Sequence, residues 1–90
     1  MNIDKLMKQA KLMQETLAAL EVEGVAGGGS VRATLSGTRH LVRLQIDPAA
    51  AEPGDVTLLE DLVLAAVHDA ERRLDEKIAG QVGGGLPFPG

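Results

Sequence analysis

The side chains that could do chemistry in this sequence are mainly cationic, and their most direct chemistry is the binding of anions. Lys5, Lys8 and Lys11 are spaced three residues apart in the first stretch of the chain. On a helix this spacing spreads them over about 120°, and their flexible ammonium groups suit contact with phosphates. The alternative is that they form a solvated helix face. Five further cations are weaker candidates for phosphate contacts: Arg32, Arg43, Arg72, Arg73 and Lys77.

Catalysis and metal binding find little support in the residue types. Ser36, His40 and Asp47 have the composition of a catalytic triad, but no nucleophile elbow or pair of oxyanion donors accompanies them. The two histidines have no histidine or cysteine at metal-ligand spacing, and the chain has no cysteine. We therefore predict a protein that is not an enzyme and has no metal or cofactor. The later carboxylates are expected to form a solvated helix face: Glu60, Asp61, Asp69, Glu71, Asp75 and Glu76.

A run of three glycines at residues 27–29, followed by Ser30, resembles a phosphate-binding loop only superficially. The surrounding residues match neither of the glycine motifs that hold phosphates at a helix N-terminus, and the residues that follow alternate as in a strand. We therefore predict that this run connects two strands of a hairpin.

Length and charge narrow the class of protein. Ninety residues suffice for one domain, and 13 acidic against 9 basic residues give a net charge of −4. This total excludes a globally basic nucleic-acid binder. Positive charge is nevertheless concentrated in residues 1–14, with three lysines against one aspartate, and in residues 31–46, with three arginines and no acid.

The apolar residues exclude further classes. No apolar run approaches the roughly 18 residues of a transmembrane helix, and charges in the first stretch argue against a secretory signal, so we expect a cytosolic protein without a membrane partner. There is no Trp or Tyr, and the single Phe88 lies near the end. Base stacking on single strands is therefore excluded, and a core without aromatics favours a homo-oligomer that shares its core.

The first twenty residues predict the helix that positions the three lysines. Asn2 is its expected N-cap. Its apolar residues recur at spacings of three and four, in a heptad-like stripe flanked by the lysines and suited to packing against another helix. The stripe consists of Ile3, Leu6, Ala10, Met13, Leu17 and Leu20.

Residues 20–46 change to a period of two and predict a three-stranded antiparallel meander. One face of this sheet is expected to be packed and the other solvated. Arg32 and Arg43 fall on the face opposite Val42 and Leu44, and so on the solvated face.

A second helix follows and is the better candidate for the core. Thr57–Glu60 matches a capping box that opens it, and Gly80 is expected just beyond its end. Residues 62–67 are apolar all round and are therefore expected to be covered on most sides. The predicted subunit is α+β with the order α-β-β-β-α, with one domain over residues 1–80 and a flexible Gly/Pro-rich tail over residues 81–90.

Short motifs along almost the whole chain carry a family resemblance. They are Met7–Ala10 and Met13–Glu15 in the first helix, Gly29–Thr34 and Val42–Pro48 in the strands, and Leu58–Val63 in the second helix. Together they resemble the YbaB/EbfC family of bacterial nucleoid-associated DNA-binding proteins. The resemblance implies a homodimer whose first helices project like the arms of tweezers. It also implies binding of double-stranded DNA with low sequence specificity, roles in chromosome organisation, compaction and gene regulation, and a cytoplasmic, nucleoid-associated location.

An adaptor of the recombination or replication machinery is the alternative hypothesis. The resemblance supports it because genes of the family often neighbour recombination and clamp-loader genes, and the apolar seam of the first helix could dock a partner helix. The expected partners are therefore double-stranded DNA and further copies of the chain, as a homodimer or larger oligomer, with recombination or replication proteins as the alternative.

Overall fold

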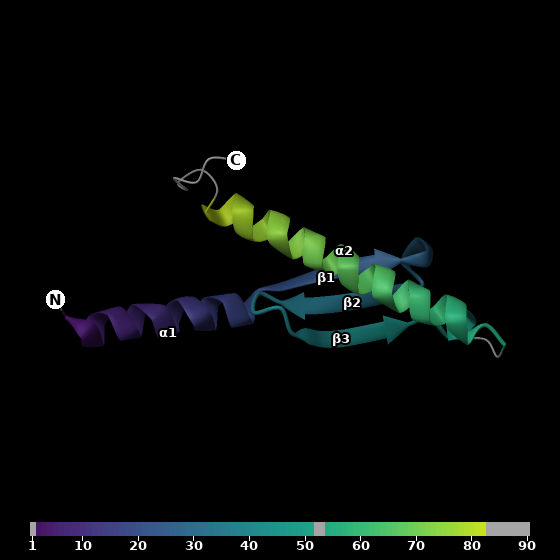
Figure 1. Cartoon of the computed structure of the whole chain (residues 1–90), viewed down its shortest axis with the longest axis horizontal. Helices are drawn as coiled ribbons and strands as arrows, with labels where there is room; N and C mark the ends of the chain where they lie inside the picture. The colour runs from purple at the N-terminus through teal and green to yellow at the C-terminus, as the bar shows by residue number, and fades with distance from the viewer. Residues whose placement is uncertain (1, 52–53, 83–90) are drawn as a thin grey trace.

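The computed structural model describes residues 2–51 and 54–82, in which two helices and a three-stranded sheet follow one another in the predicted order (Figure 1). The α+β order α-β-β-β-α is thereby confirmed. The elements are α1 (Ile3–Ala19), β1 (Glu21–Ala26), β2 (Val31–Ser36), β3 (Leu41–Ile46) and α2 (Val56–Val82), with short 3-10 turns at Gly27–Gly29 and Pro48–Ala51.

The sheet is antiparallel throughout, with β2 between β1 and β3. At the start of β2, Val31 and Ala33 are buried toward α2, whereas Arg32 is exposed on the other face. The expected alternation ends there, because Thr34 and Ser36, on the face predicted to be solvated, are buried as well. The three glycines between β1 and β2 all have positive φ, which is the backbone of a tight hairpin connection and confirms that prediction.

Small residues let α2 lie close against β1. A Cβ atom on Gly24 would stand 2.1 Å from the backbone nitrogen of Ala70 and 2.3 Å from the carbonyl oxygen of Ala66. At the position of Gly24, no side chain fits between β1 and α2. The core built around the contact is small and aliphatic, and its buried apolar residues are Val22, Val31, Ala33, Leu35, Ala66, Ala70 and Leu74.

Helix α1 projects away from the sheet and buries none of its residues (Figure 1). Asn2 caps it as predicted, because its side-chain oxygen accepts the Lys5 N–H at 3.2 Å. At the other end the Gly37 N–H donates to the Leu20 carbonyl at 2.9 Å. The radius of gyration is 17.2 Å, against about 12 Å for a compact chain of this length.

Three expectations about α2 are wrong. Asp55 rather than Thr57 caps the helix, because its carboxylate accepts the Leu58 N–H at 3.3 Å and the helix has already begun at Val56. The helix also runs past Gly80 to Val82, since one glycine costs a helix only about 1 kcal/mol. The predicted tail from residue 83 onward lies outside the described residues.

The third wrong expectation concerns residues 62–67, which are not covered on most sides. Only Ala66 is buried, and Leu64 is 56% exposed. The predicted packed face of β3 is likewise uncovered, with Leu44 at 40% and Ile46 at 36% exposure. The common reason is that α2 packs mainly on β1 and β2, so one helix leaves both its own outer side and the neighbouring strand in solvent (Figure 1).

Candidate nucleic-acid interface

The eight predicted cations lie in three separate places rather than in one patch. Three project from α1, two lie on the sheet face turned away from α2, and three lie on the C-terminal half of α2. In that order the groups are Lys5, Lys8 and Lys11; Arg32 and Arg43; and Arg72, Arg73 and Lys77.

The α1 lysines are the most accessible of the three groups. All three are exposed, and no carboxylate among the residues that the structure describes lies within ion-pair distance of them. From Lys5 to Lys11 the helix rises about 9 Å, which is about the rise of two to three phosphates along one DNA strand. The projecting helix therefore presents a short row of cations that have no ion-pair partner among residues 2–51 and 54–82.

The two sheet arginines are placed as predicted, on the solvated face. Arg43 pairs with Glu21 across the sheet at 3.7 Å between Nη2 and Oε1, with both side chains about half exposed. Such a surface pair contributes only about 0–1 kcal/mol, so a phosphate can replace Glu21 as the partner of Arg43. Arg32 lies opposite Val25 and Gln45 in the register and is also exposed.

Asp69 organises the third group, contrary to the expectation that it belongs to a solvated face. Its side chain is only 12% exposed, and its Oδ2 accepts the Val25 N–H and the Arg73 Nε–H, both at 2.9 Å. Arg72 donates to the other carboxylate oxygen. The Val25 N–H bond, with help from Arg73 and Arg72, lowers the pKa of Asp69 from 3.8 to about 2. Asp69 therefore stays ionised and holds both arginines.

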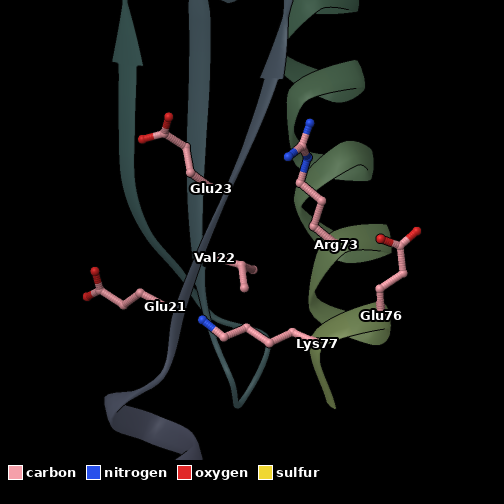
Figure 2. A pocket seen from close by; sticks show the side chains of 6 residues that line it. All are labelled: Glu21, Val22, Glu23, Arg73, Glu76 and Lys77. Carbon is pink, nitrogen blue, oxygen red and sulfur yellow. The ribbon is translucent and has the colours of Figure 1, made fainter. Parts of the chain in front are cut away.

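The α2 cations are consequently weaker candidates for DNA contact than the α1 lysines. Arg72 and Arg73 share Asp69, and Arg72 also pairs with Glu76 at 3.9 Å. Figure 2 shows Lys77 extending from α2 toward β1 over an open hollow of about 510 Å³. Acidic residues outnumber basic ones there, since the hollow is lined by Glu21, Val22, Glu23, Arg73, Glu76 and Lys77.

Two charged residues with clear structural roles escaped prediction. Arg39 adopts a positive φ of 68° in the turn between β2 and β3, and its guanidinium pairs with Asp75 of α2. Asp69 reaches a backbone N–H that is 44 residues away in the chain. Periodicity and local spacing carry no signal for either contact, because both depend on where α2 lies over the sheet.

The residues with the composition of a triad do not assemble into one. Ser36 Oγ is engaged within its own turn, accepting the His40 N–H at 3.3 Å and sharing a 2.8 Å hydrogen bond with Thr38 Oγ1. Asp47 lies beyond the far end of β3, about 20 Å away along the strand, and its carboxylate accepts the Ala49 N–H at 3.0 Å. The geometry therefore provides no Ser-His-Asp relay.

Two features are absent from the part of the chain that the structure describes: a cluster of metal-ligand side chains and a helix able to span a bilayer. Within residues 2–51 and 54–82, no three histidine or carboxylate side chains gather where they could hold a metal ion. Neither of the helices in these ranges combines the length and the apolarity that crossing a bilayer requires.

Known proteins similar to this chain share both its sequence pattern and its fold. The model of the YbaB/EbfC DNA-binding family matches residues 1–86. A nucleoid-associated protein of Rhodococcus erythropolis is 45% identical, over 96% of this chain and 84% of that protein. One of Thermoanaerobacter sp. strain X514 is 42% identical, over 99% and 89%. The crystal structure of an uncharacterized protein from Helicobacter pylori has the same fold, with a TM-score of 0.73 at 23% identity over 91% of this chain and 86% of that one.

Proposed function

The chain belongs to the YbaB/EbfC DNA-binding family, and from this premise we propose that it binds double-stranded DNA as a homodimer with low sequence specificity. Its curated relatives are named nucleoid-associated proteins. The proposal extends to a place in the nucleoid, with roles in chromosome organisation and compaction and, through them, in gene regulation.

The observation that carries the DNA contact is the row of exposed lysines on a projecting helix. Lys5, Lys8 and Lys11 have no ion-pair partner among the described residues, so binding a phosphate breaks no existing pair. Ammonium groups on flexible stems contact phosphates as point charges and carry little information about base sequence. Low sequence specificity follows because these lysines would contact phosphates, which are the same in every DNA sequence.

The homodimer is supported by an apolar surface that the single chain leaves uncovered. Ile46 at the end of β3 and several residues of α2 line an apolar hollow of about 410 Å³. The core formed by the described residues is also small and aliphatic, and covering this surface with a second copy would enlarge it. We call this the β3–α2 surface and define it as Leu44, Ile46, Val56, Leu59, Val63 and Leu64.

The dependence of affinity on salt tests the DNA contact. For duplex DNA, log K should fall linearly with log salt, with a slope of about −0.9 for each phosphate neutralised. Replacing Lys5, Lys8 and Lys11 together by Ala should weaken binding to unrelated duplexes about equally. It should also make the slope shallower by about one unit for each lysine that contacts a phosphate. Gel shifts at several salt concentrations measure both effects.

The matched control replaces an uncharged, exposed residue on the outer side of the same helix, Leu12→Ala. It keeps every charge on α1, so its affinity and slope should equal those of the parent. Duplex binding that does not weaken with rising salt would contradict the proposal, as would a triple lysine variant with unchanged affinity and slope.

The adaptor alternative makes a different prediction. An adaptor of the recombination or replication machinery would dock its partner on the exposed apolar residues of α1. Its partner should therefore stay bound after nuclease treatment, whereas proteins recovered only through shared DNA should be lost.

A further inference from the structure

We propose that the apolar stripe of α1 pairs antiparallel with the same stripe of another copy, in a self-contact separate from the β3–α2 surface. The α1 stripe is defined here as Ile3, Leu6, Ala10, Met13 and Leu17. Ile3 is 66%, Leu6 51% and Met13 68% exposed, and α1 has no buried residue.

A helix of this kind is not expected to stand alone in water. It has 17 residues and meets the rest of the chain only near its C-terminal end, where Leu17 lies against Gly37. Isolated helices shorter than about 15 residues are marginal in water, and those a little longer gain most of their stability from packing. A narrow stripe with spacings of three and four is the pattern of a helix–helix seam.

The residues beside the stripe indicate that the occupant is a second copy. With Ile3, Ala10 and Leu17 at heptad position a, the flanking e and g positions carry no charge. An identical helix can therefore approach without like-charge repulsion, whereas a partner selected by charge would meet nothing complementary. The flanking residues are Met7, Gln9, Gln14 and Thr16, and the outer positions b, c and f hold Lys5, Lys8 and Lys11.

Residue sizes and charges favour the antiparallel direction. It sets Leu6 opposite Leu17 and small Ala10 opposite long Met13, which fills the seam, whereas a parallel pair sets two Ala10 residues face to face. It also brings the lysine-rich half of each helix beside the half that carries Glu15. The two sheets then attach at opposite ends of the helix pair and do not compete for space.

Two self-complementary surfaces on one chain have a consequence for assembly. If the β3–α2 surface joins two copies and the α1 stripe joins each to another, dimers are linked into larger assemblies. The lysines stay on the outside of the α1 pair, so such an assembly can hold more than one duplex. The contact itself needs no DNA and is tested without it.

Cysteine cross-linking gives a direct test, because the chain has no cysteine of its own. Leu6→Cys and Leu17→Cys variants with tags of different size are mixed and oxidised. We expect a mixed disulfide and little self-linking of either variant. In the antiparallel pair two Leu6 positions are about 16 Å apart along the axis, well beyond the roughly 7 Å Cα limit for a disulfide. Lys8→Cys on the outer face is the matched control.

Three outcomes of this experiment would overturn the proposal. Self-linking of Leu6→Cys alone would indicate a parallel pair. Preferential linking of Leu6→Cys to a Leu44→Cys variant would place the stripe on the β3–α2 surface of another copy. Linking no faster than that of the Lys8→Cys control would show that the stripe is not an interface.

The mass in solution, measured without DNA, keeps this proposal distinct from the proposed function. The parent should exceed a dimer, Leu6→Glu should leave dimers held by the β3–α2 surface, and Leu44→Glu should leave dimers held by α1. The double variant should be monomeric. A parent no larger than a dimer, or a Leu6→Glu variant with the mass of the parent, would overturn the α1 contact and leave the DNA-binding proposal standing.

Discussion

One carboxylate, that of Asp69, occupies a backbone N–H at the outer edge of β1. An edge strand presents unpaired N–H groups to any other strand. Here the Val25 N–H is taken by Asp69, which Arg72 and Arg73 hold in place. The opposite edge of the sheet is β3, whose six residues are all exposed. The two edges of the sheet therefore differ, since Asp69 contacts β1 and the residues of β3 are left exposed.

The lowered pKa of Asp69 predicts how the stability of an Asp69→Asn variant depends on pH. The ionised group stabilises the fold at pH above about 3.8, and this contribution is lost as the pH falls toward 2. Urea denaturation should show the variant to be less stable than the parent at pH 7, with the difference closing between pH 3.8 and 2. Asp75→Asn, which removes an exposed pair with Arg39, is the control and should cost only about 0–1 kcal/mol. If the stability difference between Asp69→Asn and the parent stayed constant between pH 3.8 and 2, the lowered pKa of Asp69 would be contradicted.

At the scale of elements, the contact between β1 and α2 decides where the core forms. Replacing Gly24 by Ala places a methyl group against the backbone at Ala66 and Ala70, so α2 must move away. We expect the free energy of unfolding to fall by about 1–3 kcal/mol. Gly80→Ala is the matched control, because a Cβ atom added there would have nothing within 4 Å. It should stabilise α2 by about 0.5–1 kcal/mol. If denaturant titrations gave equal changes in the free energy of unfolding for the two substitutions, the close approach of α2 to Gly24 would not be what makes a side chain there unfavourable.

At the scale of the whole molecule, the proposed dimer through the β3–α2 surface predicts that stability depends on assembly. If two copies share this surface, the melting temperature should rise with protein concentration, because association stabilises the folded state. Leu44→Glu, which places a charge in that surface, should lower the melting temperature and weaken this dependence. Gln45→Glu puts the same charge on the other face of β3 and serves as the control. Identical behaviour of the two variants would place the dimer contact elsewhere.

The local elements and part of the candidate site could be predicted because their signals lie within a few residues. The apolar residues of α1 and residues 31–36 are periodic in sequence, Asn2 caps the helix that begins beside it, and the spacing of Lys5, Lys8 and Lys11 around α1 follows from helix geometry. The capping of α2 shows the limit of such reasoning. Two acceptors, Asp55 and Thr57, stand close together, and only the start of the helix distinguishes them.

By itself, the sequence determined the order of helices and strands, the aliphatic character of the core and the solvated placement of Arg32 and Arg43, because periodicity is a property of neighbouring residues. Only the tertiary structure decided that α2 covers β1 and β2 and leaves β3 bare, since that choice depends on the space at Gly24. The same placement brings Asp69 to the Val25 N–H. Asp69 in turn forms ion pairs with Arg72 and Arg73. Contacts between distant segments have no local pattern, and among the described residues they decide which of these cations have an ion-pair partner.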